Sequence, residues 1–171
     1  MINVVTGRFD NNTLEANYAY RNKNNFACIY SCPCKLSPKI SFDSPVFVIE
    51  MNNSTNKICG FGLIKNKPNL QKYYKVHLDG NTNRYTFIGK YYIDRETAYC
   101  KNAFLIDVLE IILFKGKTHS KRGGGLTLIP EKILKFDICN GVNIKKEIKD
   151  LFIYQFRETY NLNQINNITN N

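Results

Sequence analysis

The segment LFKGKTHSKRGGGLTLIP, from Leu113 to Pro130, places cationic side chains, a histidine and three consecutive glycines between two apolar runs. Glycines allow backbone amides to approach an anion closely, and an arginine can donate two parallel hydrogen bonds to one phosphate. This composition suits contact with a sugar-phosphate backbone, although a flexible turn with solvated lysines would share it. The predicted nucleic-acid-binding residues are Lys115, Lys117, His119, Lys121, Arg122, Gly123 and Gly124.

A nucleotide-hydrolysing P-loop is not predicted, although Gly116 to Thr118 read Gly-Lys-Thr. That motif requires a glycine five residues before its Gly-Lys pair, and this chain has Ile111 there. It also requires a strand before the loop and a helix after it, whereas the order expected here is helix, loop, strand. The segment therefore lacks the helix amino terminus that would hold the phosphate through its amides.

Two polar turns, MNNSTN and GNTNRYTF, carry side chains that could line a base pocket. An amide offers a donor and an acceptor that match a purine edge, an arginine can bind guanine or a phosphate, and an aromatic ring can stack on a base. Turn chemistry for the asparagines and core packing for the aromatic residues are the alternatives. The predicted pocket residues are Tyr30, Asn52, Asn53, Asn83, Arg84 and Tyr85, with Phe87, Tyr91 and Tyr92 as further stacking candidates.

Catalysis and metal binding have weaker support in the sequence. His77 and Asp79, two residues apart on a predicted strand, would share one face and could transfer protons, and His119 is a second candidate. No nucleophile motif or cluster of metal-binding carboxylates accompanies them. Three cysteines are clustered in CIYSCPCKL, but further zinc ligands would have to come from scattered positions. We therefore predict no catalytic residue, no metal and no cofactor, while the sequence leaves open whether Cys28, Cys32 and Cys34 bind zinc.

The hydrophobic periodicity indicates strands followed by helices. A hairpin is predicted around each of the two polar turns, and Asn102 and Asn143 are placed to begin helices. Such an order, with little alternation, indicates an α+β fold with a mostly antiparallel, strongly bent or barrel-like sheet and flanking helices. The predicted strands are 46–51, 57–64, 73–78, 84–92 and 126–129, and the predicted helices are 103–114, 130–136 and 144–156.

The chain has 171 residues, and we predict one domain, 1–160, in which 1–44 are partly irregular, followed by a disordered tail, 161–171. The 24 Lys and Arg residues against 14 Asp and Glu residues give a net charge of +10, which favours a polyanionic partner. No signal peptide or membrane-length apolar run is visible, so we expect an intracellular protein. Abundant Asn, Lys and Ile indicate the AT-rich codon usage of many large DNA viruses and some parasites, and we expect a large DNA virus as the source.

The central hairpin, SPVFVIEMNNSTNKICGFGLIKNKP, resembles the strand pair of the PUA-like superfamily, in particular EVE and YTH domains. The resemblance lies in the step Gly60-Phe61-Gly62-Leu63-Ile64 after an apolar strand and a polar turn. It implies a small bent β-barrel with helices outside it, and a pocket that holds a modified base. Those pockets typically use tryptophans, and this chain has none, so tyrosines or phenylalanines would have to stack on the base.

These observations predict a non-catalytic nucleic-acid-binding module of PUA-like type that binds RNA or DNA and could read a modified base. A viral structural or genome-packaging protein that binds any polyanion is the first alternative, and a nucleic-acid-modifying enzyme is the second. The sequence leaves open the choice between RNA and DNA and the oligomeric state.

Overall fold

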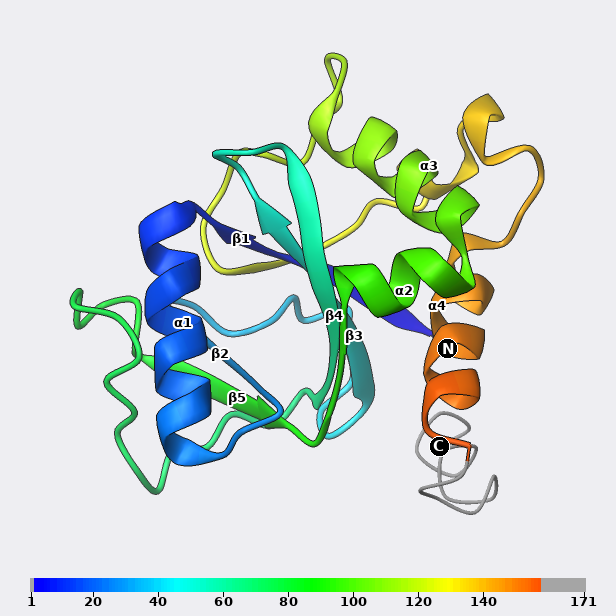
Figure 1. Ribbon diagram of the computed structural model, residues 1–171. Helices are drawn as coiled ribbons and strands as arrows, with labels where there is room; N and C mark the ends of the chain where they lie inside the picture. The colour runs from blue at the N-terminus through cyan, green and yellow to red at the C-terminus, as the bar shows by residue number, and fades with distance from the viewer. Residues whose placement is uncertain (1, 158–171) are drawn as a thin grey trace.

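The computed structural model describes residues 2–157, which form a mixed α+β fold (Figure 1). The predicted tail, 161–171, lies outside the described residues. The strands are β1 (Asn3–Phe9), β2 (Cys28–Cys32), β3 (Pro45–Asn52), β4 (Lys57–Lys65), β5 (Tyr85–Gly89), β6 (Tyr91–Asp94) and β7 (Leu126–Leu128). The α-helices are α1 (Asn11–Asn24), α2 (Arg95–Lys101), α3 (Ala103–Phe114) and α4 (Ile144–Gln155), and short 3-10 helices span Ile133–Lys135 and Asp137–Cys139.

Five strands form one sheet in the order β6-β4-β3-β1-β7, and β2 pairs with β5 in a separate two-stranded sheet. The β1–β3 pairing is parallel, whereas the other pairings are antiparallel. The α+β class is therefore confirmed. The pairings of the described residues do not close the sheet into a barrel, because β6 and β7 are its two edges.

The sheet is covered on both faces, which explains why every residue of β3 is buried. Alternate side chains of β3 point to opposite faces. Phe47, Ile49 and Met51 pack in the core that also contains residues of α2, α3 and α4. Val46 and Val48 pack in a second core with residues of α1, β2 and β5. Figure 1 shows α1 on the opposite side of the sheet from the other helices.

The amino-terminal region is more regular than its sequence indicates, because residues 3–32 form β1, α1 and β2. Helix α1 begins with a capping box at Asp10 and ends at Asn25, whose φ of 56° is left-handed. The helix was missed because its buried stripe includes Asn17 and Arg21, so the sequence shows no apolar periodicity there. Within this region, the predicted irregular structure is found between β2 and β3.

The predicted second hairpin is also wrong. Residues 73–78 form no strand, because the Asn83 side chain organises them as a loop: its Oδ1 accepts hydrogen bonds from the Val76 and His77 amides. The run 84–92 divides instead into β5, which pairs with β2, and β6, which pairs with β4. Gly89 allows this division because it packs directly against the Leu63 carbonyl, where no side chain would fit.

Two of the three predicted helices are confirmed. Helix α3 has the predicted bounds, and the Asn102 side chain accepts a hydrogen bond from the Leu105 amide at its start. Helix α4 begins after Asn143, as predicted. The predicted helix 130–136 is a 3-10 turn rather than an α-helix, and α2 was not predicted.

Candidate nucleic-acid interface

A cavity of about 170 Å³ lies at the carboxyl end of β1. This volume suits a single nucleobase better than a drug-sized ligand, whose pockets span roughly 300–1,000 Å³. Its walls come from β1, the start of α1, β2, the loop held by Asn83 and the glycine-rich loop. The lining residues are Gly7, Arg8, Phe9, Thr13, Tyr30, Ser31, Pro33, His77, Thr82, Gly124, Gly125 and Leu126.

Arg8 supplies the positive charge of this cavity. Its Nε donates a hydrogen bond to the Ser120 carbonyl, and its Nη1 donates to Thr127 Oγ1 at 2.8 Å. These neutral oxygens orient the guanidinium without neutralising it, and no carboxylate of residues 2–157 forms an ion pair with it. Partial burial lowers the pKa of Arg8, which is the sign of a charge removed from water without an opposite charge. An anionic ligand would compensate it.

His77 is the second polar side chain at the cavity, and it is only 8% exposed. Asn83 holds its backbone on both sides, accepting from the His77 amide and donating to the His77 carbonyl. Desolvation lowers the pKa of His77, although Asp10 and Asp79 act in the opposite direction, so the ring is neutral at pH 7. Its Nδ1 is buried and has no hydrogen-bond partner within the described chain.

The glycine-rich loop, 115–125, is docked onto the turn between β3 and β4. Asn53 Nδ2 donates to the Lys121 carbonyl at 3.0 Å, and Lys121 Nζ donates to Asn56 Oδ1 at 2.7 Å. Gly123 and Gly125 have φ values of 100° and 68°, which a side chain would strain. The loop is therefore held in one conformation, and Gly124 and Gly125 bring its backbone to the cavity.

The cations predicted to bind nucleic acid divide into two groups. Lys115, Lys117 and Arg122 are exposed and form no ion pair within residues 2–157. Lys121 and His119 are half-buried and shape the loop, since His119 Nδ1 accepts a hydrogen bond from the Lys121 amide. The side chains of the first group are therefore accessible from solvent.

The structure brings only Tyr30 of the six predicted pocket residues to the cavity. Asn53 anchors the glycine-rich loop, and Asn83 anchors the loop that carries His77. Asn52 accepts hydrogen bonds from the turn amides of Ser54 and Thr55, as ordinary turn chemistry would have it.

Arg84 and Tyr85 do not line the cavity, and the Arg84 guanidinium lies over the Tyr85 ring at 5.6 Å. Two residues that line the cavity were not predicted to do so: Arg8 was not identified from the sequence, and His77 was predicted only as a catalytic candidate. The sequence does contain one signal for Arg8: it lies near the end of the predominantly uncharged segment NVVTGRF. A cation in a segment that enters the core is rarely buried without a polar partner or a ligand.

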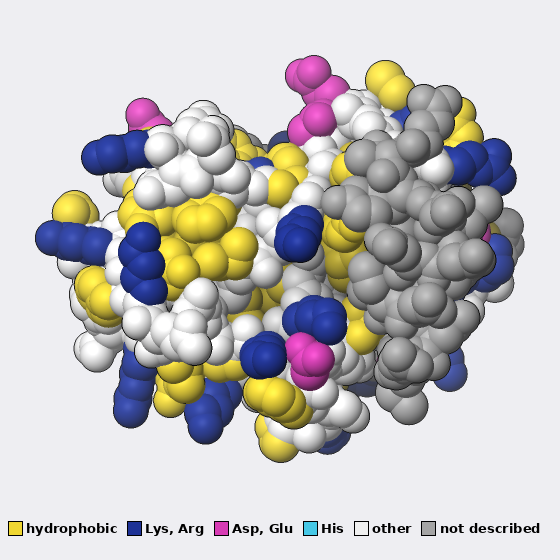
Figure 2. Space-filling model, turned by 90° about the horizontal axis from the view of Figure 1, so that it is seen from below, with side chains coloured by type: hydrophobic (Ala, Val, Ile, Leu, Met, Phe, Trp, Pro, Cys, Tyr) yellow, Lys and Arg dark blue, Asp and Glu magenta, His cyan; other side chains and the backbone are white. Residues whose placement is uncertain are grey.

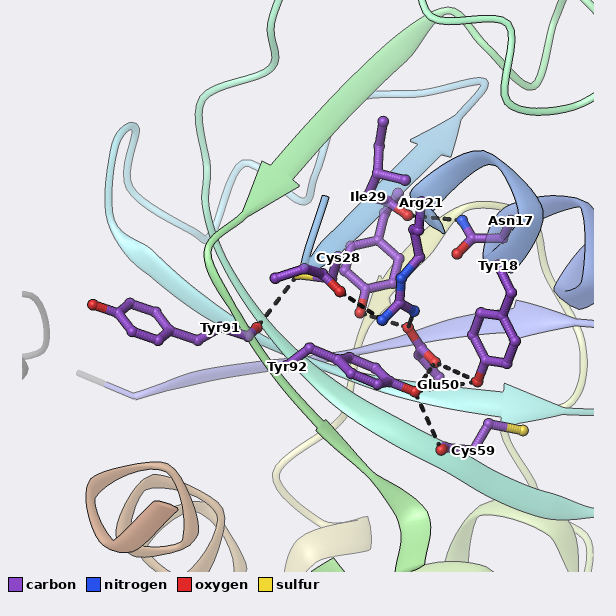
Figure 3. A network of polar contacts seen from close by, with 11 residues as sticks. Asn17, Tyr18, Arg21, Cys28, Ile29, Glu50, Cys59, Tyr91 and Tyr92 are labelled. Carbon is purple, nitrogen blue, oxygen red and sulfur yellow. Dashed lines mark hydrogen bonds and ion pairs between the residues drawn. The ribbon is translucent and has the colours of Figure 1, made fainter. Parts of the chain in front are cut away.

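A buried network of charged and hydroxyl groups lies between α1 and the five-stranded sheet (Figure 3). Glu50 is 0% exposed; its Oε1 accepts from Arg21 Nη1 at 3.1 Å and from the Tyr30 hydroxyl at 2.8 Å. Its Oε2 accepts from the Tyr18 and Tyr92 hydroxyls at 3.2 and 3.0 Å. Four donors satisfy the carboxylate, which makes this network a structural unit rather than a reactive site.

The glycine-aromatic-glycine step of β4 serves this network. A Cβ at Gly62 would lie 2.9 Å from two ring carbons of Tyr30, and a Cβ at Gly60 would lie 2.6 Å from Cζ of Tyr92. Both glycines therefore leave room for a tyrosine to reach Glu50. Phe61, between them, points to the opposite core.

The candidate catalytic and metal-binding groups are not assembled. Asp79 accepts from the Asn81 amide and the Thr82 hydroxyl, and it shares no strand with His77. Burial raises the pKa of Cys28 to about 12 and that of Cys32 to about 11. Within residues 2–157, no three His, Cys, Asp or Glu side chains are grouped to hold a metal ion.

None of the helices in the described part of the chain is long and apolar enough to span a membrane. The chain matches no protein-family model, no curated protein and no solved structure.

Proposed function

We propose that this protein is a nucleic-acid-binding module and that the cavity at the end of β1 receives one unpaired nucleotide. The observation that carries the proposal is the half-buried Arg8 guanidinium, which has neutral partners only and lines a cavity of nucleobase size. A nucleotide supplies both an anion and a planar ring, and proteins that read single bases commonly hold them in such a pocket.

Within this proposal, Arg8 contacts a phosphate, and the exposed cations of the glycine-rich loop contact the neighbouring phosphates. His77, neutral and buried, offers a ring nitrogen to the edge of the base. The glycines at 124 and 125 let the ligand approach the backbone, because no side chain stands between them and the cavity.

The proposal has two more specific parts, which are that the protein is related to the PUA-like superfamily and that the cavity recognises a modified base. They rest on the resemblance of the hairpin now seen as β3 and β4, and on a cavity of nucleobase size at the end of β1. No tryptophan is present to sandwich the base, so contacts to its edge and to the phosphate would have to contribute more.

The first test compares the wild type with a variant in which Lys115, Lys117 and Arg122 are alanine. Binding to matched single-stranded and double-stranded RNA and DNA is measured across a salt series by fluorescence anisotropy. Removing three phosphate contacts to a single strand should flatten the slope of log affinity against log salt by about 2. The matched control removes the same charge at Lys90, Lys132 and Lys135, which are exposed and lie outside the cavity, and it should keep the wild-type slope.

A second variant, Arg8→Gln, tests the cavity itself and should weaken binding at least about tenfold, the loss expected when one charged hydrogen-bonded contact is removed. Its thermal melt is recorded alongside to show that the loop still folds. Equal binding of the wild type to all four nucleic acids and to heparin would favour the packaging alternative. Absence of binding to any of them would refute the proposal.

A further inference from the structure

A second, larger concavity lies between the segments 35–42 and 66–71 and has a volume of about 720 Å³. Its buried floor is formed by Leu36, Ile40 and Phe87. Phe42 and Leu70, which are 71% and 70% exposed, also line it. It shares no lining residue with the cavity at the end of β1. We call it the lower groove, because its loops lie at the lower end of the molecule in Figure 1.

The lower groove is preformed. Asn66 Nδ2 donates hydrogen bonds to the Ile40 and Ser41 carbonyls, at 2.8 and 3.2 Å, which joins the two segments. The Asn69 amide donates to the Thr86 carbonyl and ties the second segment to β5. Phe42 and Leu70 are therefore held open to solvent beside an apolar floor, although burial of their side chains would be favourable.

The charged side chains that line the lower groove are all positive, and Asp43, which adjoins Phe42, is paired with Lys65 at 3.3 Å. Lys35 and Lys67 line the groove, and Lys39 and Lys72 are sequence neighbours of lining residues. None of these four forms an ion pair within residues 2–157, and no Asp or Glu lines the groove. Figure 2 shows hydrophobic side chains gathered on this lower face, with Lys and Arg side chains and fewer Asp and Glu side chains around them.

We propose that the lower groove binds a short segment of a partner protein in which apolar side chains alternate with or adjoin Asp and Glu. The apolar floor and the exposed Phe42 and Leu70 match the apolar side chains, and the unpaired lysines match the carboxylates. A nucleic acid would satisfy the lysines but would leave the apolar floor without a complement. A membrane surface would meet a concave floor that it cannot fill.

The test uses a phage-displayed library of random twelve-residue peptides, selected against the full-length wild-type protein. The enriched sequences should combine Leu, Ile, Phe or Met with Asp or Glu. Synthetic versions should bind the wild type, and affinity should fall at least about tenfold in the double variant Phe42→Ser, Leu70→Ser. Charge reversal by Lys35→Glu with Lys67→Glu should weaken binding of the same peptides, because it removes their electrostatic attraction to the groove. The affinity should then not depend more steeply on salt than it does for the wild type.

The control is Tyr73→Ser with Leu78→Ser, because these side chains are 62% and 96% exposed and do not line the lower groove. This variant should bind the selected peptides as the wild type does. A selection without enrichment, or peptides that bind the Phe42/Leu70 variant equally well, would overturn the proposal. Vesicles containing phosphatidylserine and a single-stranded oligonucleotide are tested in parallel. If the selection gives no peptide and the Phe42/Leu70 variant loses binding to the vesicles or to the oligonucleotide, the proposal is also overturned.

Discussion

At the scale of single residues, two glycines leave the space that the buried carboxylate of Glu50 needs for its hydrogen-bond donors. Gly60 and Gly62 leave the space through which Tyr92 and Tyr30 reach Glu50, and Arg21 completes its set of donors. Burial raises the pKa of Glu50, so the donors must offset the cost of removing its charge from water. The hydroxyls and the guanidinium share that task.

Replacing Gly62 with alanine should therefore destabilise the fold by about 3 kcal/mol, because any shift of the Tyr30 ring would break its hydrogen bond to the buried Glu50. The Tyr30 ring carbons would lie 2.9 Å from the new Cβ, and its hydroxyl would lie closer still. Urea denaturation followed by far-ultraviolet circular dichroism measures the change. Gly124→Ala is the matched control, since no atom lies within 4 Å of its Cβ position, and it should change stability by less than about 0.5 kcal/mol. Equal effects of the two substitutions would contradict the packing explanation.

At the scale of elements, Glu110 connects helix α3 to its neighbours. It accepts hydrogen bonds from Lys57 Nζ at 2.8 Å and from the Ile58 amide at 3.2 Å, both of β4. It also accepts from the Arg95 guanidinium of α2 at 3.2 and 3.1 Å. Burial opposes its ionisation, but these donors together hold the pKa of Glu110 below its ordinary value of 4.5. One carboxylate thus fixes the positions of three elements.

A carboxyl whose pKa is lower in the folded state stabilises the fold above its unfolded pKa, and this contribution disappears as pH falls through the folded pKa. Glu110→Gln should therefore lower stability by about 2 kcal/mol at pH 7. It should also make the loss of stability below pH 4.5 less steep. Thermal melts between pH 7 and pH 3 test both effects. Glu15→Gln, on the exposed face of α1, is the control, and an unchanged slope in Glu110→Gln would show that the carboxylate does not couple folding to pH.

At the scale of the whole molecule, two cores on opposite faces of one sheet hold the fold together without cross-links. All six cysteines are free thiols, and those at 28, 32 and 139 are buried. No metal-holding group occurs within residues 2–157. The two apolar cores and the buried network around Glu50 stabilise the described part of the chain.

Metal chelation should consequently leave the protein unchanged. We expect the Tm in the presence of an excess of a strong zinc chelator to differ by less than about 1 °C from that in its absence, whereas a structural zinc site would contribute several kcal/mol to folding. Differential scanning fluorimetry measures this directly. A large fall in Tm that added zinc reverses would show that the clustered cysteines at 28, 32 and 34 bind metal.

The sequence by itself determined those features that local physical chemistry specifies. The central hairpin, helix α3 with its Asn102 cap and the start of α4 follow from apolar periodicity and capping side chains within one or two turns of chain. The glycine-rich loop was also located, because cations and glycines between two apolar runs exclude regular structure. Each of these signals lies within about twenty residues, so no tertiary contact is needed to detect it.

Only the tertiary structure decided which residues form the candidate site. Arg8 meets the carbonyl of Ser120, 112 residues further along the chain, and nothing in the local sequence of either residue marks that contact. The polar stripe of α1 became interpretable only once Glu50 was seen opposite it, and 84–92 divided between two sheets because Gly89 packs against Leu63. These outcomes depend on long-range packing and on the pairing of buried polar groups, which local periodicity does not record.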